Sequence, residues 1–251
     1  MNSLVAIAYV PDTESRIKVA ADGKSLDETD VKWIVSPYDE YALEEAIQTK
    51  EAAGAGNVTV VNVGPERGKT GLRECLARGA DDAVWVDTGD SRYLDALATA
   101  KAIAAVAKGG AFDFVWFGQK GVGYDESLVG PMVAELLDLP HVGNVIQLEV
   151  GSGKVSAHRE IEGAHEVVES PLPVVLTAQK GLNEPRYPSL KGIMAAKKKV
   201  IDERPAQLGE PALEVLALTL PPARGAGKIV GEGVAAVPEL VRLLREEAKV
   251  I

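Results

Sequence analysis

The stretch best suited to binding a ligand is Gly118–Pro131, which contains four glycines. It lies between an apolar run and a helical pattern. Glycine lets a backbone approach a ligand closely. A helix that begins at Ser127 would direct free N–H groups and the positive end of its dipole toward an anion. We expect Ser127 to cap this helix and Pro131 to lie in its first turn, where a missing N–H costs little. The stretch predicts a phosphate site; the alternative is a flexible loop without a ligand.

Two acidic side chains in this stretch limit the kind of phosphate. Asp125 and Glu126 would repel a polyphosphate, so a monophosphate is favoured over a triphosphate. The sequence contains no G-x-x-x-x-G-K-[ST] motif, no G-x-G-x-x-G after the first apolar run, and no G-x-S-x-G. The three histidines do not suggest a catalytic triad or a metal site. The single cysteine, Cys75, is expected to be a small buried apolar residue.

The elements that position this stretch alternate along the first half of the chain. Strands are expected at Leu4–Val10, Val58–Val63, Ala83–Val86 and Phe112–Phe117, and helices at Pro37–Ala53, Lys69–Arg78, Tyr93–Lys108 and Ser127–Leu137. This alternation predicts a Rossmann-like parallel sheet of the adenine nucleotide-binding type, with helices on both faces. The carboxyl ends of parallel strands share one edge. Ser36-Pro37 and Gly64-Pro65 should therefore lie beside the glycine-rich stretch as walls for a base and a ribose.

The second half of the chain follows a different pattern. Val145–Val150 and Lys154–Ile161 should form a hairpin around Gly151-Ser152-Gly153, and further strands are expected at Val167–Glu169, Val174–Thr177 and Leu213–Leu220. We expect the strands between residues 145 and 177 to run antiparallel to the main sheet or to lie at its edge. A linker at Pro221–Gly233 and an amphipathic helix at Pro238–Lys249 close the chain.

These patterns divide the chain into three parts. Residues 1–180 are expected to form the α/β nucleotide-binding domain, residues 181–209 a partner-recognition loop, and residues 210–251 a C-terminal arm. The periodic pattern of apolar residues is absent from Gly181 to Gly209. A segment of this length without regular structure is usually functional.

Charge and hydropathy exclude several function classes. The net charge is −10, and the only basic cluster is Lys197–Lys199, which argues against nucleic-acid binding. No apolar run reaches the roughly 18 residues of a membrane span. Met1–Pro11 lacks the basic and cleavage regions of a signal peptide. We expect a cytoplasmic protein that does not insert into a membrane.

Four stretches together resemble one known family. Leu182-Asn183-Glu184-Pro185-Arg186-Tyr187-Pro188-Ser189-Leu190-Lys191-Gly192-Ile193-Met194-Ala195-Ala196-Lys197-Lys198-Lys199 closely resembles the signature segment of the electron transfer flavoprotein beta subunit. Ser36-Pro37-Tyr38-Asp39-Glu40, Val63-Gly64-Pro65, and Arg159-x-x-Glu162-Gly163 followed by Pro173–Thr177 are similar to three more of its motifs. The similarity runs from about Leu4 to Ile251.

The resemblance implies an electron carrier subunit and not an enzyme. Such a subunit forms a heterodimer with an alpha subunit, which holds most of the FAD, and it binds a structural AMP. The dimer takes electrons from acyl-CoA dehydrogenases and related flavoprotein dehydrogenases, as in fatty acid beta-oxidation, and passes them to a quinone reductase. The resemblance also implies that residues 210–251 pack on the alpha subunit.

The AMP contacts carry over by motif position. They fall on Ala6, Ser36, Pro37, Tyr38, Asp39, Val63, Gly118, Gln119, Gly121, Gly123, Asp125, Ser127, Leu128 and Val129. Relatives often carry polar residues where this chain has Ser127-Leu128-Val129, so backbone N–H groups are expected to hold most of the phosphate.

The same resemblance gives the segment 182–199 a role in docking. The expected docking residues are Tyr187, Leu190, Ile193, Met194, Lys197, Lys198 and Lys199. The leucine would enter a pocket on the dehydrogenase, and the lysines would steer an acidic partner. From the residues alone, Leu190 is equally compatible with a plug that packs back on its own core.

Two alternatives remain for the function. In a bifurcating flavoprotein, a second FAD would fill the AMP site and NADH would donate electrons. A stand-alone adenine-nucleotide-binding or hydrolysing domain of similar fold would be a monomer that turns over ATP. The missing P-loop and the acidic loop argue against this last alternative.

Overall fold

The computed structural model describes residues 1–89, 94–123 and 125–251. The chain forms two compact units, Met1–Ala217 and Leu218–Ile251, which are described separately. Tyr93, expected at the start of the third helix, and Tyr124, in the glycine-rich stretch, lie outside the described residues.

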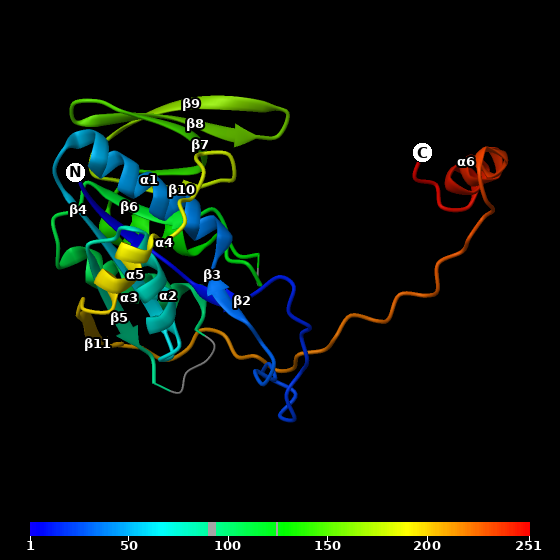
Figure 1. The fold of residues 1–251 in the computed structure, drawn as a ribbon, viewed down its shortest axis with the longest axis horizontal. Coiled ribbons are helices and arrows are strands. Elements are labelled where there is room, and N and C mark those ends of the chain that lie inside the picture. The colour runs from blue at the N-terminus through cyan, green and yellow to red at the C-terminus, as the bar shows by residue number, and fades with distance from the viewer. Residues whose placement is uncertain (90–93, 124) are drawn as a thin grey trace. The chain divides into compact units, whose positions relative to one another are not determined.

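A nine-stranded sheet runs through the first unit in the order β11-β5-β4-β1-β6-β10-β7-β8-β9 (Figure 1). Its strands are β1 (Asn2–Ala6), β4 (Asn57–Gly64), β5 (Asp82–Asp87), β6 (Phe114–Gly118), β7 (His141–Val150), β8 (Lys154–Ile161), β9 (Ala164–Pro171), β10 (Val174–Ala178) and β11 (Ile201–Pro205). Neighbouring strands are parallel from β11 to β7. The strands β8 and β9 continue the sheet in antiparallel pairing.

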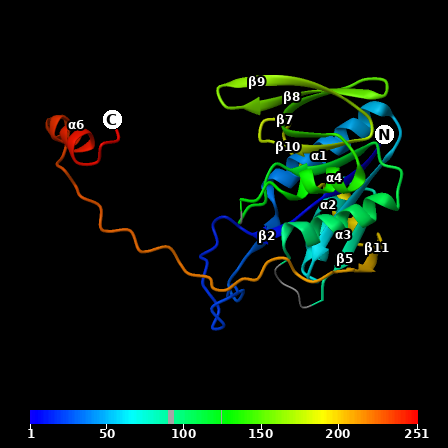
Figure 2. The same ribbon diagram turned by 180° about the vertical axis from the view of Figure 1, so that it is seen from behind.

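Helices cover both faces of the sheet, as the second view shows most clearly (Figure 2). They are α1 (Pro37–Ala53), α2 (Gly68–Arg78), α3 (Ala96–Lys108), α4 (Val129–Leu137) and α5 (Leu190–Ala196). Residues of α1, α2 and α5 share one apolar core with the sheet, and residues of α3 and α4 share the other. Successive strand residues point to opposite faces, so Leu4 and Val5 of β1 belong to different cores. The predicted Rossmann-like α/β fold is therefore confirmed.

The helix α1 matches its predicted bounds. Pro37 occupies its first turn, Leu43, Ala46 and Ile47 are buried, and Gly54 ends it in a left-handed conformation with φ of 68°. Ser36 occupies the N-cap position of this helix, but its hydroxyl makes no capping hydrogen bond. The Ser36 carbonyl instead accepts from the Asp39 N–H at 2.9 Å.

The later strands are partly as predicted. The hairpin of β7 and β8 is antiparallel, and Gly153 at its turn has a φ of 75°. The placement of Val174–Thr177 at an edge or in antiparallel pairing is wrong, because β10 lies between β6 and β7 and is parallel to both. All five residues of β10 are buried. An unbroken apolar run of this kind is typical of an interior parallel strand, which explains the misplacement.

Two expectations for residues 181–220 are also corrected. The segment 181–209 is not irregular throughout, since it contains α5 and also β11, which pairs with β5 in the main sheet. Leu213–Leu220 is not a strand. Its side chains at Leu213 and Leu216 are exposed, and no sheet edge in the described chain pairs with it. Apolar alternation alone does not make a strand without a hydrogen-bonding partner.

The excursion between β1 and α1 carries its own small sheet. The strands β2 (Tyr9–Pro11) and β3 (Trp33–Val35) pair antiparallel. The Tyr9 and Trp33 rings stack with centroids 6.4 Å apart. The Arg67 guanidinium lies 3.9 Å from the centre of the Trp33 ring, which ties this small sheet to the start of α2.

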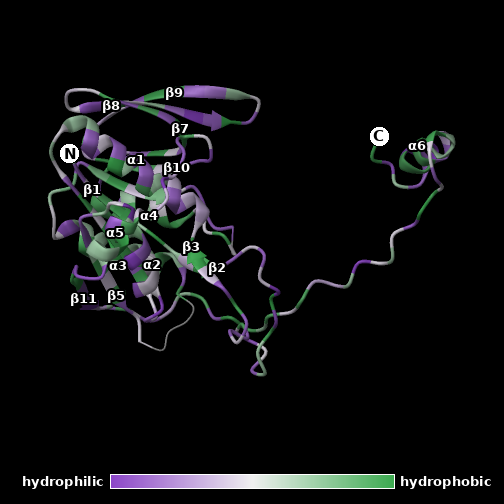
Figure 3. Ribbon diagram, in the orientation of Figure 1, coloured by the Kyte–Doolittle hydropathy of each residue, from purple (hydrophilic) through white to green (hydrophobic). Residues whose placement is uncertain are grey.

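The second unit consists of a linker, a 3-10 turn η1 (Val234–Ala236) and the helix α6 (Val237–Glu246). The helix is amphipathic in the hydropathy colouring, as predicted (Figure 3). On its polar side Arg242 pairs with Glu239 and Glu246 at 2.7 and 2.9 Å. Among the described residues, no helix has both the length and the apolar character needed to cross a membrane.

Candidate functional site

The carboxyl ends of β1, β4 and β6 meet the start of α1 at one edge of the sheet (Figure 1). One carboxylate joins three of these elements: Asp39 of α1 accepts from the Ala8 N–H at 2.8 Å and from the Gly118 N–H at 2.9 Å. The Ser36 N–H donates to the Ala8 carbonyl at 2.9 Å. The start of α1 is therefore fixed against the ends of β1 and β6 by its own polar groups.

Burial determines the electrostatics of Asp39. Desolvation raises the pKa of Asp39 to about 7, against the lowering effect of the two amide hydrogen bonds. Both carboxylate oxygens are used inside the protein. Asp39, a predicted AMP contact, thus lies at the expected edge of the sheet. Its side chain, however, is used in hydrogen bonds that join α1 to the ends of β1 and β6.

Gly118 has a different role from the one that the glycine-rich stretch suggested. A Cβ at this position would lie 2.4 Å from Asp39 Oδ1 and 2.7 Å from the Tyr38 Cβ. The missing side chain therefore allows β6 to approach α1, and not only a ligand to approach the backbone.

Within the described chain, Ser36 has an unused polar group at this edge, as does Asn62 of β4 through its Oδ1. The Ser36 side chain is fully buried, and its Oγ has no hydrogen-bond partner among the described residues. A buried hydroxyl without a partner is costly and calls for an explanation, such as a ligand or an ordered water. Ala6, at the end of β1, is buried, while Pro37, Tyr38 and Val63 are half-buried around it.

The loop after β6 closes on itself. The Gly121 N–H donates to the Glu126 carbonyl at 2.9 Å, and the Asp125 N–H donates to the Gly121 carbonyl at 2.9 Å. The Lys120 ammonium lies 3.0 Å from Asp125 Oδ1, so one of the two acidic charges has a counter-ion within the loop. Gly121, Asp125 and Glu126 are therefore joined in an internally hydrogen-bonded turn.

The start of α4 is open. The predicted cap at Ser127 is wrong, because the helix begins at Val129, its N-cap residue is Leu128, and no side chain caps it. The Ser127 hydroxyl instead accepts from Gln119 Nε2 at 3.5 Å. Ser127 and Leu128 are exposed. The first-turn N–H groups thus lack a side-chain acceptor, as a backbone anion site requires.

The structure brings the predicted nucleotide residues together at this one edge. Ala6 and Val63 lie at the ends of β1 and β4, Ser36, Pro37, Tyr38 and Asp39 at the start of α1, and Gly118, Gln119, Gly121, Gly123, Asp125, Ser127, Leu128 and Val129 in the loop that leads to α4. Their contact with a nucleotide stays a prediction.

The segment 182–199, the recognition segment, is held to the first unit by side chains that sequence patterns did not identify. Arg186 is the main clamp: its Nε donates to Glu44 Oε2 at 2.9 Å, and its Nη1 donates to Glu51 Oε1 at 2.7 Å. Glu44 is only 4% exposed. Asn183 Nδ2 donates to the Tyr41 carbonyl at 3.0 Å. These partners all belong to α1, far away in the sequence.

A second set of contacts fixes α5 against α2. The Ser189 Oγ caps α5 by accepting from the Gly192 N–H at 3.0 Å. A Cβ on Gly192 would lie 2.1 Å from the Ala77 carbonyl oxygen, so only glycine permits this approach. Arg73 donates to the carbonyls of Ala196 and Lys199. The helix is therefore locked at both ends.

Apolar side chains project outward from this locked segment. Tyr187 is 93% exposed, Leu190 79% and Met194 53%, and Ile193 is also exposed. The exposure of Leu190 excludes the plug alternative; Leu182 packs against the core instead. Leu190, Ile193 and Met194 follow the spacing of one helix face.

The three lysines at the end of the recognition segment differ in their exposure and in their hydrogen bonds. Lys197 and Lys198 are exposed. The Lys199 ammonium donates to the carbonyls of Ala80 and Asp81, both at 2.7 Å. This ammonium therefore holds the segment in place. Within the predicted set, Lys197 and Lys198 are exposed cations without an ion pair among the described residues.

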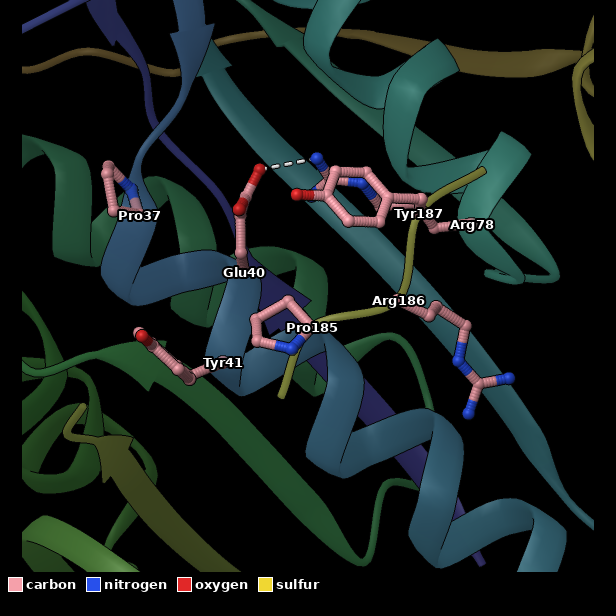
Figure 4. A pocket seen from close by; sticks show the side chains of 7 residues that line it. All are labelled: Pro37, Glu40, Tyr41, Arg78, Pro185, Arg186 and Tyr187. Carbon is pink, nitrogen blue, oxygen red and sulfur yellow. Dashed lines mark ion pairs between the residues drawn. The ribbon is translucent and has the colours of Figure 1, made fainter. Parts of the chain in front are cut away.

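A small hollow lies between α1, the end of α2 and the recognition segment (Figure 4). Its lining includes Pro37, Glu40, Arg78, Pro185 and Tyr187. The Arg78 Nη2 lies 2.5 Å from Glu40 Oε1. No sequence motif pointed to Arg78, because its partner Glu40 lies in a different helix, α1.

Comparison with known proteins gives one consistent result. The family model of the electron transfer flavoprotein domain matches residues 24–208. The electron transfer flavoprotein subunit beta of Bacillus subtilis is 41% identical over 260 residues, covering all of both chains. That of Syntrophomonas wolfei is 38% identical over 98% of this chain and 97% of its own. A mitochondrial one from Oryza sativa is 36% identical over the full length of both. The chain therefore belongs to the electron transfer flavoprotein family, as a beta subunit.

Proposed function

We propose that this beta subunit binds AMP at the carboxyl edge of its sheet as a structural ligand. The observation that carries the proposal is the fully buried Ser36 Oγ without a partner, at the start of α1 and beside the end of β1. The uncapped start of α4 supplies N–H donors for a phosphate. The remaining acidic side chains of the loop, Glu126 and the partly neutralised Asp125, suit one phosphate better than three.

The AMP has no redox role in this proposal. Electrons are carried by an FAD that the alpha subunit holds for the most part, and the two subunits form a heterodimer. This chain contributes a shaped surface to that dimer. In this proposal the chain supplies no redox group of its own, and its single cysteine, Cys75, is buried in the described structure. The chain is a carrier subunit and not a catalyst.

The recognition segment is the docking site for the electron donors in this proposal. Its apolar side chains are exposed while its backbone is clamped by Arg186, Arg73 and Lys199. A rigid surface with an exposed leucine suits an anchor that enters a pocket on an acyl-CoA dehydrogenase or a related flavoprotein dehydrogenase. Reoxidation by a quinone reductase completes the electron path.

One experiment separates AMP from the alternative nucleotide. The purified heterodimer is denatured, and the released nucleotides are identified by mass and counted per dimer. One AMP and one FAD support the proposal. Two FAD and no AMP would place a second flavin in this site, as in a bifurcating flavoprotein that takes electrons from NADH. A Ser36→Ala variant should lose AMP occupancy while FAD stays bound, because the substitution removes a side-chain hydroxyl that only the site's ligand would use.

A further inference from the structure

The hollow beside the recognition segment contains an arginine with unused hydrogen-bonding capacity (Figure 4). The side chain of Arg78 is 16% exposed, and its Nη2 pairs with Glu40. Its Nε and Nη1 are buried and have no partner among the described residues. A guanidinium carries five N–H donors in a fixed fork, so donors of this fork remain free for an acceptor that the chain itself does not provide.

The charge around Arg78 indicates the kind of acceptor. Glu40 neutralises Arg78 directly, and Glu74 is close enough for its pKa to be affected by Arg78. On the other side of the hollow, Arg186 is matched by Glu44 and Glu51. The hollow therefore holds no excess positive charge, and a carboxylate entering it would meet Glu40. A neutral acceptor, such as a peptide carbonyl, suits it better.

The walls of the hollow suit an extended chain. Pro37 and Pro185 provide rigid apolar surfaces, and Tyr41 and Tyr187 add aromatic ones. Tyr187 lies between the clamped Arg186 and Pro188. Its backbone is therefore held in place before any partner arrives, while its ring is almost fully exposed. Proline and aromatic surfaces with a few hydrogen-bond donors are common in sites that bind extended peptide segments.

We infer that this hollow is a second docking subsite, which receives an extended segment of the dehydrogenase and donates from Arg78 to one of its main-chain carbonyls. Tyr187 is shared by the hollow and the recognition segment and stands three residues before Leu190, so one partner surface can reach both. The inference rests on the proposed function, because it assumes that the dehydrogenase docks here. This second subsite adds a polar contact of fixed geometry, made by Arg78, to the apolar contact made by Leu190.

The test uses the heterodimer and an acyl-CoA dehydrogenase, with the rate of flavin reduction measured against dimer concentration. The double variant Glu40→Gln/Arg78→Gln removes the fork without leaving an unpaired charge. It should raise KM about tenfold, the factor that corresponds to about 1.4 kcal/mol, with kcat unchanged. The factor by which KM rises should be the same at low and high ionic strength, because salt does not screen a hydrogen bond to a neutral acceptor as it screens an ion pair. Tyr187→Ala should raise KM in the same way.

Two results would overturn the inference. An unchanged KM in the double variant, with its unfolding midpoint also unchanged, would mean that the hollow holds only water. A KM effect that shrinks at high salt would mean that the acceptor is a carboxylate. The Leu190→Ala variant separates this test from the test of the proposed function. If Leu190→Ala impairs electron uptake while the double variant does not, the docking proposal is supported and the second subsite is ruled out. If Leu190→Ala has no effect, the docking proposal itself falls.

Discussion

The nucleotide edge and the recognition segment differ in where their polar groups are satisfied. At the nucleotide edge, the Ser36 hydroxyl and the first-turn N–H groups of α4 have no side-chain partner in the described chain. In the recognition segment, Arg186, Ser189 and Lys199 all find partners within the chain, and the exposed side chains of α5 are mostly apolar. In the proposed function, the first region is completed by a ligand that brings hydrogen bonds. The second pairs those three polar groups within the chain, although Asn183 Oδ1 has no partner among the described residues, and it offers apolar surface.

This contrast also separates two kinds of mutational effect. Side chains that hold either region should act on stability, because their partners are internal. Side chains that face outward should act on binding only. The following predictions test that division from the largest expected effect to the smallest.

The largest effect should come from the Arg186 clamp. Arg186→Ala leaves the buried Glu44 carboxylate without its cation, which should lower the free energy of unfolding by about 3–5 kcal/mol. Chemical denaturation measures this loss. A matched control is Arg204→Ala, whose exposed pair with Asp202 should contribute at most about 1 kcal/mol. Equal losses in both variants would contradict the clamp.

The clamp also has a pH dependence. Burial alone would raise the pKa of Glu44, but its hydrogen bonds, chiefly those from Arg186, outweigh burial and lower it below the ordinary value of 4.5. A lowered acid pKa contributes stability that is present above the unfolded pKa and is lost as the pH falls through the folded one. The cost of Arg186→Ala should therefore shrink below about pH 4.

The outward-facing leucine should affect binding alone. Leu190→Ala should raise the KM for the dehydrogenase by a factor that corresponds to about 1.5–3 kcal/mol, because the anchor loses its burial in the partner. Flavin-reduction kinetics measure this factor, and the unfolding free energy should not change. Val200→Ala is the matched control, since Val200 is similarly exposed but lies beyond α5. If both variants dock as well as the wild type, Leu190 is not an anchor.

The carboxylate that joins the nucleotide edge should affect stability in a pH-dependent way. Asp39→Asn leaves one backbone N–H without an acceptor, which should cost about 1–3 kcal/mol near pH 5. The folded pKa of Asp39 is raised from 3.8 to about 7, so wild-type stability from this group declines as the pH rises through that window. The difference between variant and wild type should then narrow toward pH 8 in urea titrations. A gap that stays constant from pH 5 to pH 8 instead would mean that the carboxylate is ionised throughout.

The smallest effect should come from the exposed lysines Lys197 and Lys198. Lys197→Gln/Lys198→Gln should reduce the association rate with an acidic dehydrogenase severalfold at low salt and hardly at all near 1 M salt, where screening acts within about 3 Å. Stopped-flow mixing at several salt concentrations measures this effect. The maximal rate of electron transfer should stay constant, since the bound complex is unchanged. A loss that persists at high salt would point to a direct contact.

Local signals explain how much of the fold was predictable. α1 was predicted to the residue, because Pro37 and Gly54 mark its ends. By contrast, β11 was missed because only Ile201 of its five residues is buried, so the strand shows no apolar pattern. A strand like this depends on backbone pairing with β5, which no local sequence pattern reveals. Leu213–Leu220 is the opposite case. It has the apolar pattern of a strand, but no strand in the described chain pairs with it.

The site was predictable in its location and not in its internal contacts. Parallel topology was enough to bring Ser36, Val63 and the loop after β6 to one edge. It did not show that Asp39 faces inward, because that depends on the close approach of Gly118. The Arg186 clamp joins residues 142 positions apart, a distance over which composition and periodicity carry no information.

The clamped recognition segment has a consequence for turnover. A carrier binds and leaves its donors and acceptors many times, and each ordering of a flexible side chain on binding costs roughly 0.5–1.5 kcal/mol of lost conformational freedom. Because Arg186 and Gly192 fix the backbone of the segment in advance, the proposed docking would order only its exposed side chains at each encounter. In the proposed docking role, a surface ordered in advance needs less contact area for a given affinity, so a few apolar side chains suffice for a transient complex.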